Sequence, residues 1–423
     1  MEVLNSPTFK RLQREFRKTV TVSDDPDPAI EMANAGAASV QVTPAPRADV
    51  VAYTYDLNTG LGQAAKMNIA ALRENGLTVE QRLWKGELDL GQEALDDPNL
   101  IVYHHWHPQP NEKTRNWPAA MFGRARHIAY WAYEALDSDL TEFRQFAPRA
   151  SEIWVPSRFC HEIFRVHHRI VHVLPHAVDS TDQKLGPLPF QQGGRPLTVL
   201  YLFDGWSRLP RKNPEAVIRV FQKAFRTRQD VRLIIKAHNL SPAEEQMLRT
   251  KCGFDSRIVL INRFMEEAEL DKLFASADVL LSLQRSEGFG LNLAKALARG
   301  LPVITTGFGG HLDFCNARTA WLVPWTLAPV SRSKDSFYDG GGFWADPKES
   351  EAIALLKEVA QMISENSPAL LRKREKGRRM MAEHFSRDAL RMGIGQLLRK
   401  DVAPPKKAIS PRRERVKERV QTS

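Results

Sequence analysis

The feature that most constrains this chain is a repeated alternation of short apolar runs with amphipathic, helix-like segments. In the second half, the runs LTVLYLFD, VRLIIKAH, RIVLINRF, DVLLSLQ and PVITT alternate with segments of helical periodicity. Comparable runs occur in the first half, among them LIVYHHW, HIAYWAY and EIWVPS. Buried strands that alternate with helices are typical of βα units in a mostly parallel sheet. The sequence therefore predicts two consecutive doubly wound α/β domains, whose ligands bind beyond the carboxyl ends of their strands.

Composition divides the 423 residues into segments of different character. The first segment is rich in Pro, Ala and Asp and poor in large apolar side chains, and the last is short and basic, so we expect disorder in both. A Gly- and Pro-rich stretch between the two α/β regions predicts a linker. The expected segments are a disordered N-terminus (1–48), an N-terminal Rossmann-like domain (49–187), the linker (188–196), a C-terminal Rossmann-like domain (197–375), a terminal helix (376–400) and a disordered basic tail (401–423).

The positive charge of the chain is concentrated at its C-terminal end. The net charge is +10, yet residues 371–423 hold 17 Lys and Arg against six Asp and Glu, which leaves the remainder close to neutral. A neutral body without a known nucleic-acid module argues against nucleic-acid binding. Three scattered cysteines argue against a disulfide framework, and no apolar run reaches the length of a membrane-spanning helix. The N-terminus also lacks the apolar core of a secretory signal, so we expect a cytoplasmic protein.

Two glycine-containing segments are candidates for ligand binding because each follows an apolar strand and opens a helix. Gly60 and Gly62 lie in the first, where exposed helix-start amides favour anions, although a tight turn that binds nothing fits the local pattern equally well. The second segment, SEGFGLN, follows DVLLSLQ. A capped helix is the alternative there, but glycines on both sides of an aromatic residue favour a ligand site. Its candidate residues are Glu287, Gly288, Phe289, Gly290, Leu291 and Asn292.

Cations and histidines supply further candidates. The loop SRLPRKNP follows the first strand of the second half and contains Arg208, Arg211 and Lys212, which suit a pyrophosphate, although a solvated basic loop is the usual alternative. His104 follows the run LIVY and is a candidate acid, base or hydrogen-bonding group. Neither the HHxH stretch nor the histidines of 161–176 have a known metal-ligand spacing, so no metal site is expected.

Several segments, in the same order, resemble the GT-B glycosyltransferases of the large retaining family called group 1 or GT4. The strongest is SLQRSEGFGLNLAKALARGLPVITTGFGGHLDF, which is similar to the family pattern SEGFGLxLxEAMAxGxPVI. The segments WAYEAL, IWVPSRF and VLPHAVD resemble a bacterial subgroup, as do RKNPEAVIRVF and FWADP. The resemblance covers about residues 50–400. It implies a GT-B fold, with the acceptor mainly on the N-terminal half and a nucleotide-sugar donor on the C-terminal half.

The resemblance also implies roles for individual residues. Lys212 matches the lysine that neutralises the donor pyrophosphate, and Glu287 matches the first glutamate of the E-x7-E motif, near the donor sugar. The amides of residues 288–290 would meet the hydroxyls of that sugar, and the loop of Gly60 and Gly62 would face the donor phosphates. His104 is the best match to a histidine beside the reacting centre, with His105 as a rival. The terminal helix is expected to cross back to the N-terminal domain.

The sequence departs from the family pattern at two donor-binding positions. Lys295 replaces the second glutamate of E-x7-E, and an ammonium cannot accept hydrogen bonds from a ribose, so Lys295 either contacts phosphate or ribose recognition differs. Ser207 replaces the arginine five positions before Lys212, where Arg208 or Arg211 could supply the charge.

The expected activity is metal-independent, retaining transfer of a sugar from a nucleoside-diphosphate sugar to a glycan or lipid-linked acceptor. No cofactor is expected, and the basic tail is a candidate for contact with anionic membrane. The alternative is a non-catalytic GT-B-like glycan-binding or scaffold protein that has lost donor recognition.

Overall fold

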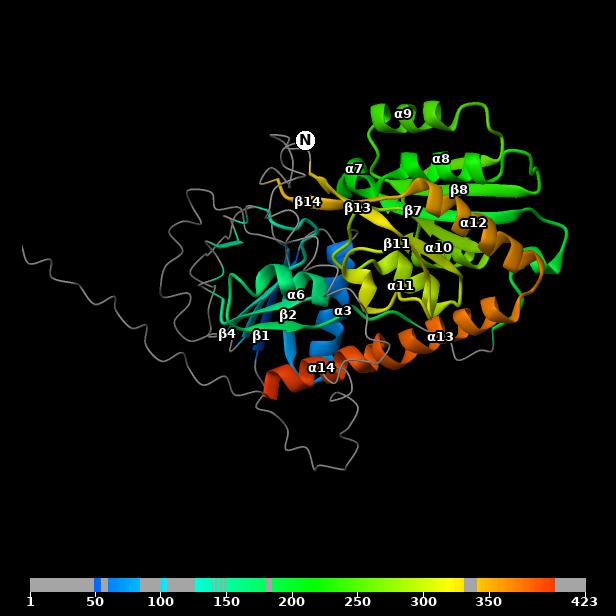
Figure 1. Ribbon diagram of the computed structural model, residues 1–423. Helices are drawn as coiled ribbons and strands as arrows, with labels where there is room; N and C mark the ends of the chain where they lie inside the picture. The colour runs from blue at the N-terminus through cyan, green and yellow to red at the C-terminus, as the bar shows by residue number, and fades with distance from the viewer. Residues whose placement is uncertain are drawn as a thin grey trace, which may run out of the picture.

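The computed structural model contains two six-stranded parallel sheets, one in each half of the chain (Figure 1). It describes residues 49–54, 60–83, 100–104, 126–138, 140, 143–144, 147, 150–179, 185–330 and 341–399. The predicted disordered segments 1–48 and 401–423 lie outside these residues. No described helix is both long enough and apolar enough to cross a membrane.

The first sheet belongs to the N-terminal half and has the strand order β2-β1-β3-β4-β5-β6. Its direction of winding reverses between β1 and β3, which are hydrogen-bonded neighbours. Helices α3 and α6 are its clearest covering elements, and Ser157 caps α6 by accepting a hydrogen bond from the amide of Cys160. The elements are β1 (Asp49–Thr54), α3 (Gly60–Glu74), β2 (Thr78–Leu83), β3 (Leu100–His104), β4 (Arg126–Tyr130), β5 (Glu152–Val155), α6 (Arg158–Phe164) and β6 (Val171–Val173).

The second sheet has the order β12-β11-β10-β7-β8-β9, and its winding reverses between β7 and β10. Because βαβ crossovers are right-handed, this reversal places α8 and α9 on one face and α10 and α11 on the other, as Figure 1 shows. A capping box of Ser241 and Glu244 marks the start of α9. The elements are β7 (Leu197–Asp204), α7 (Leu209–Lys212), α8 (Pro214–Ala224), β8 (Val231–His238), α9 (Pro242–Cys252), β9 (Ile258–Asn262), α10 (Glu267–Ala275), β10 (Val279–Ser282), α11 (Leu291–Ala298), β11 (Val303–Thr306) and β12 (Trp321–Val323).

The remaining elements connect the two halves. An antiparallel hairpin of β13 (Trp325–Pro329) and β14 (Phe343–Pro347) is joined to the N-terminal half by a backbone bridge between Leu136 and Phe343. Buried side chains of both halves, including Trp131 and Phe308, share one apolar cluster. The helix α12 (Glu349–Ser364) then covers the second sheet and packs on α8.

The C-terminal segment differs in detail from the expected single helix over 376–400. The structure has two helices in this region, α13 (Pro368–His384) and α14 (Arg387–Arg399). The break between them begins at Phe385, whose backbone is non-helical and whose ring packs against Phe314 in the core. Figure 1 shows α14 lying against α3 of the N-terminal half. The expected linker contains a 3-10 turn (Pro189–Gln192) that is fixed to the C-terminal half, since the amide of Phe190 donates to Asp278.

Candidate functional site

The candidate site lies where the winding of the second sheet reverses. In open α/β sheets the strand ends at such a reversal leave room for a ligand. The carboxyl ends of β7 and β10 are followed here by the two segments that the sequence singles out, SRLPRKNP and SEGFGLN. Residues 70 or more positions apart in the sequence therefore meet at one edge of the sheet.

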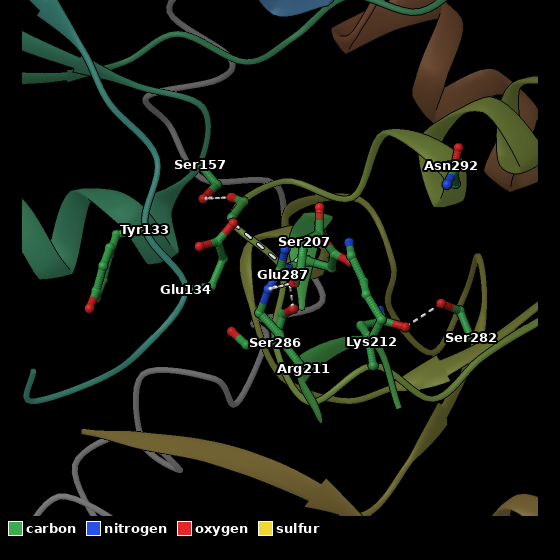
Figure 2. Close-up of polar contacts among 12 residues, drawn as sticks. Tyr133, Glu134, Ser157, Ser207, Arg211, Lys212, Ser282, Ser286, Glu287 and Asn292 are labelled. Carbon is green, nitrogen blue, oxygen red and sulfur yellow. Dashed lines mark hydrogen bonds and ion pairs between the residues drawn. The ribbon is translucent and has the colours of Figure 1, made fainter. Parts of the chain in front are cut away.

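Lys212 and Glu287 form the central ion pair of the site. The Lys212 Nζ atom lies 2.5 Å from Glu287 Oε1, and the two side chains are 12% and 16% exposed (Figure 2). The backbone around Lys212 is fixed from two sides. Its carbonyl accepts a hydrogen bond from the Tyr201 hydroxyl, and Asn213 adopts a left-handed conformation that ends α7 and lets Pro214 begin α8. The side-chain amide of Asn213 also donates to the Leu283 carbonyl at 3.0 Å.

Arg211 adds a second, more deeply buried cation. Its guanidinium is 5% exposed and donates to the carbonyl of Ser286 at 3.0 Å and to that of Ser207 at 3.2 Å. Its Nη1 atom also lies 3.4 Å from Glu287 Oε2 and 3.7 Å from Glu134 Oε1. The two consecutive cations of the loop therefore face two carboxylates, one from each half of the chain.

The two cations of the group favour the ionised form of the Glu287 carboxyl. Burial alone would raise the pKa of the Glu287 carboxyl, but Lys212 and Arg211 hold that pKa below its ordinary value. Burial and the neighbouring Arg211 lower the pKa of Lys212, while Glu287 opposes both effects. An anionic ligand would meet two cations that are already buried and positioned, which is the condition for strong electrostatic binding.

Glycines in the SEGFGLN segment and in the neighbouring connection at Gly310 allow very close packing around Glu287. The amide of Gly310 donates to the Glu287 carbonyl at 2.6 Å, and a Cβ atom at Gly310 would lie 1.9 Å from the Gly288 carbonyl oxygen. That same oxygen accepts a hydrogen bond of 2.5 Å from Ser157 of the N-terminal half. Gly290 has a φ of 93° and precedes the first residue of α11. The helix α11 therefore begins directly after the segment that carries Glu287, and the contact of its first amides with a donor stays a prediction.

Phe289 is a structural residue through its side chain. The residue is 4% exposed, and its ring packs against His176, Phe314 and Phe385. Any contact of Phe289 with a ligand would therefore involve its backbone.

The structure also shows the contacts or exposure of four other residues that are predicted to bind the donor: Ser207, Arg208, Leu291 and Asn292. Ser207 contributes its carbonyl to Arg211, and Arg208 is exposed with a φ of 71°. Asn292 donates to the carbonyl of Leu202 at 3.3 Å, and Leu291 is half-buried at the start of α11.

Lys295 forms an ion pair with Glu267 at the start of α10. Both carboxylate oxygens of Glu267 lie close to Lys295 Nζ, at 2.7 and 2.9 Å. The two alternatives for Lys295, contact with phosphate or altered ribose recognition, both stay predictions. The structure adds that a carboxylate from a neighbouring helix stands beside this lysine.

In the N-terminal half, the predicted residues lie at the corresponding reversal between β1 and β3. Gly60 and Gly62 begin α3, and His104 ends β3. His104 is 2% exposed, with its Nε2 atom 3.2 Å from the side-chain amide of Asn68. Burial lowers the pKa of His104 to about 3, so the imidazole is neutral at pH 7 and suits hydrogen bonding better than proton transfer. His105 lies outside the described residues.

An aromatic chain connects His104 to the SEGFGLN segment. The rings of His104 and Tyr130 lie 5.7 Å apart, and the Tyr130 hydroxyl is 2.9 Å from His176 Nδ1. His176 then meets Phe289 edge to face at 4.8 Å. A continuous series of contacts therefore links His104 of the N-terminal half to the SEGFGLN segment of the C-terminal half. Among the described contacts, none joins His104 directly to Lys212 or Glu287.

Two residues of the site were not predicted from the sequence. His311 is fully buried beside the SEGFGLN segment, and its Nε2 atom is 2.7 Å from the Thr306 carbonyl. Glu134 approaches Arg211 from the N-terminal half, and its only sequence signal is its place in the segment WAYEAL. The described residues contain no group of three or more histidine, cysteine or acidic side chains arranged to hold a metal.

Comparison with known proteins gives a family match for part of the second half of the chain. Residues 206–328 match the family model of the glycosyl transferases group 1. HepE of Anabaena, solved with UDP and glucose, is 15% identical, with a TM-score of 0.60 over 83% of this chain and 99% of that one. Sucrose-phosphate synthase of Thermosynechococcus elongatus is 14% identical, with a TM-score of 0.60 over 84% of this chain and 98% of that one. A search of curated protein sequences gave no match.

Identities this low show a shared fold, and the coverage extends that fold across both sheets. A glycosyltransferase of Rickettsia africae gives the same result, at 10% identity and a TM-score of 0.59 over 84% of this chain and 98% of that one. The predicted GT-B architecture is confirmed. Residues 206–328 thus match the glycosyl transferases group 1 model, and they lie within a GT-B fold.

Proposed function

We propose that this protein transfers a sugar from a nucleoside-diphosphate sugar to a hydroxyl group of a glycan or lipid-linked acceptor, with retention at the anomeric carbon. The observation that carries the proposal is the pair of buried cations, Arg211 and Lys212, held with Glu287 at the β7–β10 reversal of a group 1 domain. UDP-sugars are the first donors to test, because HepE was solved with UDP-glucose and with UDP and glucose.

The proposed chemistry needs little from the protein beyond charge and position. As the bond between the anomeric carbon and the phosphate oxygen breaks, its electron pair stays with the nucleoside diphosphate, which becomes more negative. Lys212, Arg211 and the amides at the start of α11 stabilise that charge, so no metal ion is required. The acceptor oxygen bonds to the anomeric carbon on the leaving-group face and gives its proton to the departing phosphate. No covalent nucleophile is needed, and Glu287 binds the donor and balances the cations.

The acceptor and the cellular setting belong to the same proposal. A lipid-linked acceptor fits a cytoplasmic enzyme of cell-surface polysaccharide synthesis that works at the inner face of a bacterial membrane. Residues 401–423 carry seven Lys and Arg against three Asp and Glu. Such a segment gains about 1 kcal/mol per surface-proximal cation from anionic lipid.

A donor screen tests the proposal directly. We expect one UDP-, GDP- or ADP-sugar to raise the melting temperature of the purified protein and to be converted to free nucleoside diphosphate. Lys212→Ala should weaken donor binding about 10- to 100-fold, because it removes a charge-assisted contact to the phosphates. Glu287→Ala should lower turnover as well, since it leaves two buried cations without their main carboxylate.

Lys251→Ala is the matched control for these variants. Lys251 also pairs with a glutamate, Glu215 at 2.9 Å, but it is 49% exposed and belongs to α9. It should leave donor binding unchanged. Binding of no nucleotide sugar, together with unchanged behaviour of both site variants, would contradict the proposal. Binding without release of nucleoside diphosphate would instead favour the non-catalytic, glycan-binding alternative.

A further inference from the structure

We infer that Glu134 is the residue of the N-terminal half that binds the acceptor, by accepting a hydrogen bond from a sugar hydroxyl next to the transferred group. The inference rests on the proposed function and deepens it, since it assigns the acceptor class and the carboxylate that selects it. It begins from the one carboxylate that reaches the Lys212–Glu287 group from the opposite half among the described contacts.

The backbone around Glu134 holds its side chain toward the site. Residues 131–136 follow β4 and alternate between buried and half-buried positions, with Tyr133 and Ala135 on the buried side. The carbonyl of Tyr133 accepts a hydrogen bond from Cys160, and Leu136 is bridged to Phe343. Because alternate residues of an extended segment point to opposite sides, Glu134 points away from the core.

The C-terminal half is shaped to receive this side chain. Glu134 Oε1 lies 3.7 Å from Arg211 Nη1, and Figure 2 marks this ion pair with a dashed line. A Cβ atom at position 288 would lie 3.3 Å from the Ala132 Cβ atom and 3.8 Å from the Glu134 Cγ atom. Gly288 therefore lets the segment that carries Glu134 approach closely.

The charge of Glu134 indicates which substrate it serves. A carboxylate repels a diphosphate, so Glu134 is unsuited to hold the part of the donor that Arg211 and Lys212 attract. A carboxylate accepts hydrogen bonds from hydroxyl groups, and such charge-assisted bonds are strong. The two cations come from the C-terminal half, and Glu134 comes from the N-terminal half. The site therefore offers positive charge for the donor phosphates on one side and a carboxylate for acceptor hydroxyls on the other.

A purely structural role as an ion pair between the halves explains the position less well. The Arg211–Glu134 contact across the halves is an ion pair at 3.7 Å. The halves are also joined more tightly elsewhere. Arg158 binds Asp313 at 3.0 Å, and Ser157 donates to the Gly288 carbonyl at 2.5 Å.

The test separates acceptor effects from donor effects in the full-length protein. Wild type, Glu134→Gln and Glu134→Asp are compared in three assays. The first two measure UDP binding and the hydrolysis of UDP-glucose or of the best donor in the screen. The third measures sugar transfer to the methyl glycosides of glucose, galactose, mannose and N-acetylglucosamine. We expect Glu134→Gln to lower kcat/KM for the glycoside about 10- to 100-fold, through a higher acceptor KM. UDP binding and donor hydrolysis should change less than about 2-fold, and Glu134→Asp should restore part of the loss.

Arg158→Ala is the control, because it removes an ion pair between the halves without touching the Lys212 group. It should leave the acceptor KM unchanged. The inference is overturned if Arg158→Ala reproduces the acceptor defect, if Glu134→Gln weakens UDP binding as Lys212→Ala does, or if no glycoside accelerates UDP release in the wild type. A wild-type protein that binds and hydrolyses no nucleotide sugar contradicts the proposed function instead.

Discussion

Identical residue types have different roles in this chain because their partners differ. Lys212 and Lys295 each pair with a glutamate at short distance, but the partner of Lys212 lies at the centre of the site. Glu267, the partner of Lys295, is 56% exposed at the start of α10. The sequence singles out both lysines. Only the contacts of the folded chain show that the Lys212–Glu287 ion pair lies in the site and that Lys295 pairs with an exposed carboxylate.

Three of the buried histidines, His104, His176 and His311, are expected to lower the stability of the fold in acid. Burial lowers the pKa of His104 and His176 to about 3 and that of His311 to about 4. An unfolded histidine titrates near 6.5, so below that pH the unfolded state binds more protons than the folded state. Their stabilising effect is therefore complete above pH 6.5 and is lost as the pH falls toward 4. At pH 5 each histidine accounts for a loss on the order of 2 kcal/mol.

The measurement is the free energy of unfolding by urea between pH 7 and pH 4.5. His176→Asn retains a hydrogen-bonding partner for the Tyr130 hydroxyl. It should reduce the slope of the free energy of unfolding against pH by up to about 1.4 kcal/mol per pH unit. His161→Asn, which removes a half-exposed histidine of α6, is the comparison variant. Equal slopes for wild type and His176→Asn would contradict the assignment.

At the scale of elements, the site is built from strand ends and tight connections. The loop after β7 turns through the left-handed Asn213, and the SEGFGLN segment packs against the 3-10 turn of Gly310–Asp313. The close approach at Gly310 is the most restrictive of these contacts, because no side chain fits between residue 310 and the Gly288 carbonyl. The position of Glu287 thus depends on a neighbouring connection as well as on its own strand.

Gly310→Ala tests this dependence. The added methyl group would lie 1.9 Å from the Gly288 oxygen, so the two connections must separate, at a cost of about 1–3 kcal/mol in stability. We expect UDP binding to fall at least about 10-fold, because Glu287 and the start of α11 shift with the loop. Gly186→Ala is the control, since a Cβ atom there meets nothing within 4 Å. Isothermal titration with UDP beside a thermal melt measures both effects, and unchanged binding in a folded Gly310→Ala protein would contradict the prediction.

The sequence was sufficient for the elements and for part of the site. Strand and helix periodicity is local, so the two sheets and the segments SEGFGLN and RKNP could be located from it. Contacts between distant segments carry no such local signal. The Arg211–Glu134 pair, the approach of Ser157 to Gly288 and the burial of His311 depend on how the halves pack, and they became evident only in the structure.

At the scale of the whole molecule, the two halves are coupled through the end of the chain. Apolar side chains of α14, Leu390, Ile394 and Leu397, belong to the same buried cluster as Ile69 and Leu72 of α3. Two polar contacts support this packing, from Asn75 to the Arg391 carbonyl and from Arg126 to the Leu397 carbonyl. The core of the first sheet is therefore completed by residues more than 300 positions further along the chain.

Ile394→Ala should consequently destabilise the N-terminal half although the mutation lies near the C-terminus. Ile394 is fully buried, and truncation of such a side chain costs about 2–5 kcal/mol. Met392→Ala, two residues away at a side chain that is 40% exposed, is the matched control and should cost less than about 1 kcal/mol. Hydrogen exchange followed by mass spectrometry locates the effect. We expect faster exchange in α3 and β1 of Ile394→Ala and little change in β7 and β8, and uniform acceleration over both sheets would show that the halves unfold as one unit.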